Sequence, residues 1–257
     1  MTTLAFAGAA ASGALAGALS GVFGIGGGIV LVPLLALVLG LSQHEAQGLT
    51  LAVLVLPIGL PAVLAYRRYT VIRWRLVLAL VAGFVFGVVG GARAANWLPD
   101  KPLRMLFVAF LVAVGVQGWR AHRRPEARSL PTAAASDWHG VWIGVAAGAL
   151  SGLLGIGGGI VMVPLLVHAA RLGRLEAQAT SLAAMLPPVG LPGVVVYAAA
   201  RGGLPWIDLL TVAVSFGAGA LAGARLATRA SPLTLGRAFS LFVFAVAAAL
   251  GGTLLWR

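Results

Sequence analysis

The sequence has no cysteine and very little charge. Only 9% of its 257 residues are charged, and 6 of them are acidic, whereas a soluble domain carries about 25% charged residues. The lack of cysteine excludes a disulfide framework, a thiolate nucleophile and a cysteine-based metal site. The lack of charge excludes a soluble globular domain, which needs a polar surface. With 4 histidines and 6 acids, no convincing metal site or catalytic triad can be assembled, so we expect neither a cofactor nor enzymatic activity.

Apolar residues are abundant. They make up 60% of the chain, and the mean hydropathy is +1.02, which is typical of a polytopic membrane protein. A net charge of +12 would suggest a nucleic-acid partner in a soluble protein. Here the arginines fall between apolar runs, so the positive-inside bias of membrane proteins explains them, and we expect the lipid bilayer and no nucleic acid as a partner.

Long uncharged stretches locate the expected membrane segments, since a span needs about 20 mostly apolar residues. A cluster of four glycines around one isoleucine divides the first and the fifth of these stretches, at Gly24–Gly28 and Gly155–Gly159. That division predicts 8–10 segments, the glycine-split pairs being either spans or re-entrant hairpins. The uncharged stretches are 1–43, 46–66, 76–92, 105–119, 140–167, 177–200, 209–224 and 238–256.

The two halves of the chain are copies of each other. Residues 20–38 match residues 151–169 at 13 of 19 positions, an offset of 131 that also pairs Glu45 with Glu176 and Thr50 with Ser181. A duplicated membrane unit is typical of transporters. We therefore predict an all-α fold and one membrane domain over 1–257. Its parts are a first repeat at 4–119, a linker at 120–137 and a second repeat at 138–256.

An odd number of segments per half predicts that the second repeat is inverted relative to the first. If the linker 120–137 is cytoplasmic, 13 of the 18 basic residues lie inside and 5 outside, as the positive-inside rule requires. Both chain termini then lie outside. Inverted repeats bring their broken segments together near the middle of the bilayer, so we expect the two glycine clusters to approach each other there.

Small residues recur at a spacing of four, which places them on one helix face where two backbones can approach closely. We predict helix–helix contacts at these residues. They are Gly13, Gly17 and Gly21; Gly83, Gly87 and Gly91; Gly140, Gly144, Gly148 and Gly152; and Ser215, Gly219 and Gly223.

The paired GIGGG elements are the sharpest functional feature. So many glycines disfavour a helix, at a cost of about 1 kcal/mol each relative to alanine. Unwound backbone at the start of a new helix offers N–H donors and a positive dipole end, which suits an anion. We predict an anion site between the clusters; a tight turn between short helices is the alternative. The predicted glycines are Gly26, Gly27 and Gly28 with Gly157, Gly158 and Gly159.

Polar side chains open the next segment of each half. Gln47, Thr50, Gln178, Thr180 and Ser181 can donate hydrogen bonds to an oxyanion and complete the predicted site. Hydrogen bonding between helices explains them equally well.

Several motifs together resemble the sulfite exporter TauE/SafE family of bacterial membrane permeases. They are the two GIGGG blocks with the VPLL that follows each, LSQHEAQGLTLA (41–52), RLEAQATSLAA (174–184) and the GAR-x-A elements at 91–95 and 223–227. The resemblance covers essentially the whole chain. It implies an inner-membrane permease that moves small sulfur anions such as sulfite, thiosulfate or organosulfonates. The family's Thr-Ser pair is present at Thr180-Ser181, but the first copy reads Leu49-Thr50, so the first half contributes fewer hydroxyls.

Five ionisable residues are candidates for coupling or gating. Glu45 and Glu176 follow Ser42 and Gly173 by three residues, a spacing that favours helix capping over proton coupling. Arg93 and Arg225 end equivalent segments, where contact with lipid headgroups is the default and attraction of anions the alternative. His168 lies in an apolar run without a partner in the first repeat, and an intramembrane histidine is a functional candidate.

We therefore predict a secondary transporter for a small anion, because no ATP-binding motif is present. An anion channel with the glycine loops as its filter is the alternative. Import and export are alternatives for the direction of transport, and a homodimer is a candidate oligomeric state.

Overall fold

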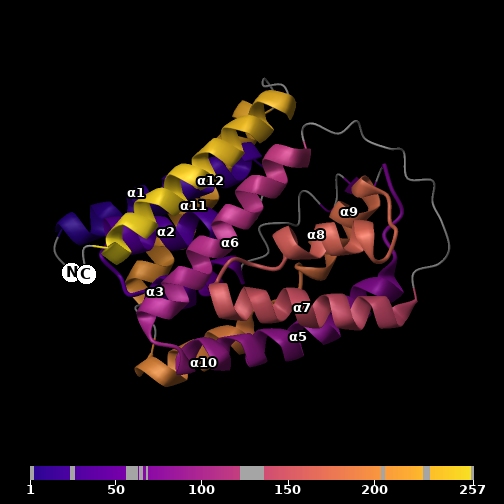
Figure 1. The fold of residues 1–257 in the computed structure, drawn as a ribbon, viewed down its shortest axis with the longest axis horizontal. Helices are drawn as coiled ribbons and strands as arrows, with labels where there is room; N and C mark the ends of the chain where they lie inside the picture. Colours follow the sequence, from indigo (N-terminus) through magenta and orange to yellow (C-terminus); the bar gives the residue numbers. More distant parts are fainter. Residues whose placement is uncertain are drawn as a thin grey trace. The chain divides into compact units, whose positions relative to one another are not determined.

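The computed structural model describes residues 3–23, 27–55, 63, 66–67, 69–121, 136–203, 206–227 and 232–255. These residues form eleven α-helices and no strand, which confirms the all-α fold (Figure 1). Five of the described helices are long and apolar enough to cross a membrane. The chain divides into two compact units, which are described separately.

The first unit comprises Met1–Gln47, Trp97–Glu126 and Leu204–Arg257. Its central contact joins α1 to α11, which lie side by side (Figure 1). A Cβ atom added to Gly17 of α1 would lie 2.0 Å from the Phe216 carbonyl oxygen of α11, so the two backbones touch. The helices of the unit are α1 (Thr3–Phe23), α2 (Gly28–Val38), the start of α3 (Gln43–Leu54), α6 (Asp100–Ala121), α11 (Trp206–Ala227) and α12 (Pro232–Leu255).

The second unit comprises Gly48–Asn96 and Ala127–Gly203. Here α5 and α7 lie side by side (Figure 1), and a Cβ on Gly87 of α5 would lie 2.2 Å from the Val145 carbonyl oxygen of α7. A Cβ on Gly148 of α7 would in turn lie 2.3 Å from the Phe84 carbonyl oxygen. The unit contains the rest of α3 with α5 (Trp74–Trp97), α7 (Asp137–Leu154), α8 (Gly159–His168), α9 (Arg174–Ala184) and α10 (Leu191–Arg201).

The glycine faces thus make the predicted helix–helix contacts, and they join helices of opposite halves. In the first unit α11 comes from the second half and packs on α1 of the first half; in the second unit α5 comes from the first half and packs on α7 of the second. Each compact unit therefore contains helices from both halves of the sequence.

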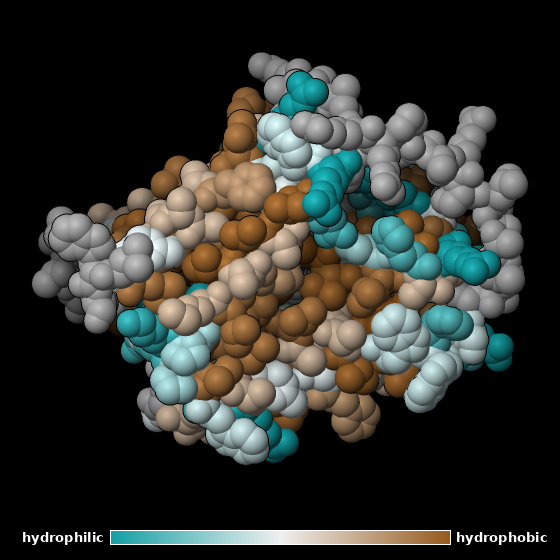
Figure 2. Space-filling view, viewed as in Figure 1, coloured by the Kyte–Doolittle hydropathy of each residue, from teal (hydrophilic) through white to brown (hydrophobic). Residues whose placement is uncertain are grey.

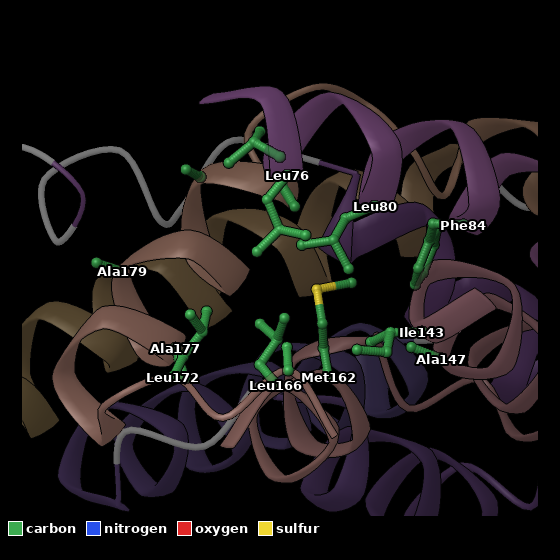
Figure 3. Packing of buried hydrophobic residues seen from close by; sticks show 14 of the residues in the cluster. Leu76, Leu80, Phe84, Ile143, Ala147, Met162, Leu166, Leu172, Ala177 and Ala179 are labelled. Atoms are coloured by element: carbon green, nitrogen blue, oxygen red, sulfur yellow. The ribbon is translucent and has the colours of Figure 1, made fainter. Parts of the chain in front are cut away.

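A buried apolar cluster supports the α5–α7 contact in the second unit. Leu76, Leu80 and Phe84 of α5 point toward Ile143 of α7 and Met162 of α8 (Figure 3). Burial of each such side chain contributes about 1.5–3 kcal/mol. The Tyr197 hydroxyl adds a polar contact, because it donates a 2.8 Å hydrogen bond to the Gly152 carbonyl and so ties α10 to α7.

Short helices follow both glycine clusters. α2 has 11 residues and α8 has 10; at 1.5 Å per residue each is about 15–16 Å long, roughly half of a 30 Å hydrocarbon core. The stretch 177–200, which we expected as one segment, is also broken. α9 ends before Pro187 and Pro188, and α10 begins after them, because proline lacks a backbone N–H and its ring clashes with the preceding helical turn.

Much of the described surface is apolar. On the face in Figure 2, hydrophobic residues cover most of the area between scattered hydrophilic patches. Leu78, Phe86 and Val214 are among the large apolar side chains that are more than two-thirds exposed. Such a surface suits lipid rather than water. The inverted relation of the repeats and the limits of the linker stay predictions; residues 122–135 of the linker lie outside the described residues.

The close α5–α7 contact generates a stability prediction. Gly87→Ala would place a methyl group 2.2 Å from a backbone oxygen, and we expect it to destabilise the protein by about 1–3 kcal/mol, as overpacking does. Gly90→Ala, on the same helix with open space around the added atom, is the matched control and should stabilise the helix by up to about 1 kcal/mol. The thermal unfolding midpoint in detergent measures both; equal midpoints would contradict the contact.

Candidate functional site

Three consecutive glycines, Gly157, Gly158 and Gly159, form the N-terminal end of α8, which we call its head. The structure requires glycine at the first two of these positions for different reasons. Gly157 has φ +74°, a left-handed conformation that favours glycine. Gly158 has φ −76°, which any residue can adopt, but a Cβ there would lie 2.3 Å from Phe84 Cε2 and 2.9 Å from Met185 Cε. Backbone conformation therefore requires glycine at 157, and packing requires it at 158.

Neither reason applies to Gly159. It is the first residue of α8 and has no positive φ. The nearest heavy atom to an added Cβ would be Ser181 Oγ at 4.0 Å, an ordinary van der Waals distance. The fold thus leaves room for a side chain beside Ser181, and alanine would be the better helix former at this position.

Four helix ends of the second unit meet around these glycines. Leu54, at the end of α3, would lie 3.1 Å from a Cβ on Gly157. Met185 follows the last residue of α9 and covers Gly158. Gly190, which precedes α10, lies close to α3, because its Cβ would be 3.5 Å from Val55 Cγ2. Helix ends from both halves of the chain therefore converge within one unit.

The backbone at the head of α8 offers hydrogen-bond donors. The N–H groups of Val161 and Met162 donate to the Gly158 carbonyl. The N–H groups of Gly159 and Ile160 precede them and belong to the set that a helix leaves without partners. Together with the positive end of the helix dipole, they favour a negative charge.

Buried hydroxyls accompany these donors. Thr50 and Thr180 are 0% exposed, and within the described part of the chain neither side-chain oxygen has a hydrogen-bond partner. Thr180 adjoins Ser181 on α9, and Thr50 lies one turn before Leu54 on the same face of α3. A buried hydroxyl without a partner costs about 1–3 kcal/mol, and the predicted contact of these two hydroxyls with a polar ligand stays a prediction.

The remaining predicted site residues lie as follows. Gln178 is half-buried on α9, and Gln47 is fully buried on α3 in the part that belongs to the first unit. Gly27 and Gly28 are buried at the head of α2, also in the first unit, and Gly26 lies outside the described residues. The structure thus brings Gly157, Gly158 and Gly159 together with Ser181 within one unit, and the role of the predicted set stays a prediction.

The two candidate glutamates have different partners. Glu45 closes the expected capping box: the Ser42 backbone N–H and hydroxyl donate to its Oε2 at 2.8 and 2.7 Å, and its own N–H donates to Ser42 Oγ at 3.3 Å. Glu176, its repeat equivalent, accepts a 2.5 Å hydrogen bond from Arg73 Nε. The two halves therefore use the same glutamate for different contacts.

The other ionisable candidates are exposed. Arg93 and Arg225 are exposed near the ends of α5 and α11, as contact with headgroups requires. His168 is exposed at the end of α8, and its Nδ1 lies 2.8 Å from the Pro164 carbonyl oxygen. An N–H at Nδ1 donates to this carbonyl, which is a local helix-end contact.

Two features escaped the sequence-based prediction. His44 is 5% exposed and contacts the Asp100 carboxylate; the residues are 56 positions apart, and no motif links them. Phe84, which covers Gly158, has a repeat equivalent in Phe216, whose Cζ would lie 2.2 Å from a Cβ on Gly27 in the first unit. The offset of 132 that pairs Gly91 with Gly223 also pairs these two rings, so the repeat contained a signal for them.

The profile described as "Sulfite exporter TauE/SafE" matches residues 9–250, nearly the whole chain. The chain belongs to the sulfite exporter TauE/SafE family. TauE/SafE membership confirms the resemblance seen in the motifs and makes the chain a multi-pass membrane transporter.

Curated relatives of this TauE/SafE chain have similar names. A "probable membrane transporter protein" of Xylella fastidiosa is 31% identical over 244 residues, which is 92% of this chain and 91% of the relative. Two others, from Methanocaldococcus jannaschii and Bacillus subtilis, are each 28% identical; the alignments cover 61% and 66% of this chain and 60% and 70% of those relatives. No solved structure matches the chain.

The buried hydroxyl of Thr180 gives a test of the site that needs no substrate. Thr180→Val keeps the shape and removes a hydroxyl that has no partner in the described part of the chain. We expect the unfolding midpoint without substrate to stay the same or rise, because replacing an unsatisfied buried polar group by an apolar one is neutral or stabilising. A fall in midpoint equivalent to about 1 kcal/mol, the value of a typical hydrogen bond, would show that the hydroxyl serves the fold instead.

Proposed function

We propose that this TauE/SafE chain is a secondary transporter that moves a small anion across the bacterial inner membrane. The anion is a sulfur oxyanion or an organosulfonate such as sulfite. The family description supports the substrate class, since it names a sulfite exporter, and the relatives' names support transport. The proposal assigns no catalytic residue and no cofactor.

The space beside Gly159 is the observation that carries this proposal. Packing or backbone conformation explains the glycines at 157 and 158, but neither explains the one at 159, where an added Cβ would face Ser181 Oγ at 4.0 Å. A ligand oxygen at this place would meet the Ser181 hydroxyl and the N–H groups of Gly159 and Ile160. The two N–H groups can only donate and the hydroxyl can also donate, so these groups favour a hydrogen-bond acceptor.

The chemistry of the donors favours a weakly held anion. A buried anion needs donors aimed at it, because its desolvation otherwise costs several kcal/mol. Backbone N–H groups, the helix dipole and neutral hydroxyls supply this stabilisation without a full opposite charge. Neutral donors let the ligand leave again, which transport requires.

Broken helices fit the same function. In secondary transporters, substrate sites are built from discontinuous helices whose N-terminal ends point at anionic groups. α8 and α10 begin, and α3 and α9 end, around the proposed site of the second unit. In the second unit, Thr50, Gln178 and Thr180 complete the proposed polar set. In the first unit, Gly27 and Gly28 form the equivalent helix head, and Gln47 is the proposed polar residue.

Gly159→Ala distinguishes a ligand-binding role of this glycine from a structural role. If the glycine serves the ligand, the variant should be more stable but transport less; if it serves the fold, the variant should be less stable. The added methyl group has room in the protein and should raise the unfolding midpoint slightly, by up to about 1 kcal/mol in stability. The same methyl group lies in the proposed anion position and should strongly reduce sulfite flux in proteoliposomes. Gly90→Ala is the matched control, with the same change at an exposed helical glycine, and should transport normally.

Ser181→Ala completes this test. Loss of one hydrogen bond to a charged group should weaken the apparent sulfite affinity by about 1.5–3 kcal/mol. A panel of sulfite, thiosulfate, sulfoacetate and sulfate defines the anion, and saturable, concentrative uptake distinguishes a transporter from a channel. Unchanged flux and affinity in well-folded Gly159→Ala and Ser181→Ala variants would reject the site.

Orientation in the membrane has its own test. The chain has no native cysteine, so Ser129→Cys introduces a single thiol in the linker. We propose from the positive-inside rule that this linker is cytoplasmic, so a membrane-impermeant thiol reagent should label it in inverted vesicles and leave it unlabelled in intact cells. Labelling from outside intact cells would reverse the proposed orientation.

A further inference from the structure

Two phenylalanine rings occupy equivalent places in the two units. In the second unit, a Cβ on Gly158 would lie 2.3 Å from Phe84 Cε2; in the first, a Cβ on Gly27 would lie 2.2 Å from Phe216 Cζ. Phe84 is 1% exposed and Phe216 is 2% exposed. Each unit thus buries a ring directly against the backbone of a glycine, and the glycine and the ring come from opposite halves of the sequence.

Each ring covers the end of a short helix where N–H donors gather. Gly158 caps α8 and Gly27 caps α2, since their carbonyls accept hydrogen bonds from Met162 N at 2.9 Å and Leu31 N at 2.8 Å. A phenyl ring accepts hydrogen bonds only weakly. It therefore excludes other molecules from the helix end without satisfying the donors there.

A second observation, independent of the ring, concerns the buried hydroxyls of α9 near the second unit's helix end. Ser181 is 2% exposed and its Oγ faces Gly159, the residue next to the one that Phe84 covers. Thr180, adjacent on α9, is fully buried, and its hydroxyl has no partner in the described part of the chain. The Phe84 ring and the Ser181 hydroxyl thus lie beside consecutive residues of one helix head, Gly158 and Gly159.

We propose that Phe84 and Phe216 are plugs that determine which anions reach the helix heads. With the ring in place, as in the structure, the helix end is closed; an anion binds there only when the ring moves aside, so the ring limits the size of the anion. For the identity of the ligand, this inference rests on the proposed function. Access to the helix head can be measured without any anion.

The proposal requires the Phe84 ring, which is 1% exposed, to move within its buried surroundings. A change of side-chain rotamer moves the ring without moving the α5 backbone. Met185 also covers Gly158, with its Cε 2.9 Å from the position of an added Cβ, and an unbranched methionine adapts readily to a changed neighbour. The backbone contact of α5 with α7 at Gly87 holds the helix that carries the ring.

Thiol labelling at Ser181 tests the plug directly. Ser181→Cys places the only thiol of the chain beside Gly159, and a small charged methanethiosulfonate reports its accessibility in proteoliposomes. Adding Phe84→Ala should raise the labelling rate by about tenfold or more, because a covered site reacts only in the fraction of molecules in which it is open. Phe84→Leu keeps most of the apolar volume and should give a smaller increase.

Leu80→Ala is the matched control. It removes a buried side chain one turn away on the same helix and from the same apolar cluster, but it leaves Phe84 on Gly158. Labelling should stay near the rate of the parent variant that carries only Ser181→Cys. If Leu80→Ala increases labelling as much as Phe84→Ala, or if neither Phe84→Ala nor Phe84→Leu increases it, Phe84 only fills the core and the proposal is wrong.

Flux measurements test the size limit in proteins that have the native Ser181. The ratio of ethanesulfonate to sulfite uptake should rise several-fold in Phe84→Ala and in Phe216→Ala, and stay unchanged in Leu80→Ala. An unchanged ratio in both phenylalanine variants, with sulfite still transported, would overturn the size limit. Failure of the wild-type protein to move any anion of the panel would reject the proposed function instead, and the labelling rates would still decide whether Phe84 covers the helix head.

Discussion

The backbones of α1 and α11, and of α5 and α7, touch because their facing residues have no side chains. This contact is available only to helices with small residues at every fourth position, and each pair takes one helix from each half of the chain. The added atom at Gly17 or Gly87 would meet a backbone oxygen at 2.0 or 2.2 Å, so a side chain at either position would force the two helices apart. These glycines therefore determine how closely the two helices of each pair approach.

Phe84 shows how the contact leads to the site. The ring belongs to α5, whose glycine face fixes it against α7. The same helix pair therefore holds the ring over Gly158, at the head of the next helix after α7. Phe216 of α11 stands in the same relation to α1 and to Gly27 at the head of α2. In each unit, the helix pair that packs through its glycine face thus also contributes the phenylalanine ring that covers a glycine at the start of the following short helix.

The sequence predicted the features that depend on local pattern. The all-α class follows from apolar segments, the breaks after α1 and α7 from glycine clusters, and the capping box at Ser42 and Glu45 from its spacing. It did not predict which glycine face packs on which, because periodicity defines a face but not its partner. It also missed the break at Pro187 and Pro188 and the contact of His44 with Asp100. The break lies inside an uncharged run that we interpreted as one segment. The contact joins residues that are 56 positions apart, and no sequence pattern links them.

The three glycines of the α8 head illustrate why a motif alone is ambiguous. In sequence they are identical, and both a tight turn and an anion site explain them. In the structure Gly157 has the left-handed conformation of a turn, Gly158 is the floor beneath a phenylalanine ring, and only Gly159 has room for a side chain beside a serine hydroxyl. Glycine at position 159 costs helix stability and neither conformation nor packing requires it. This is why, among the three glycines of the α8 head, the proposed anion site is centred on Gly159, next to the Ser181 hydroxyl.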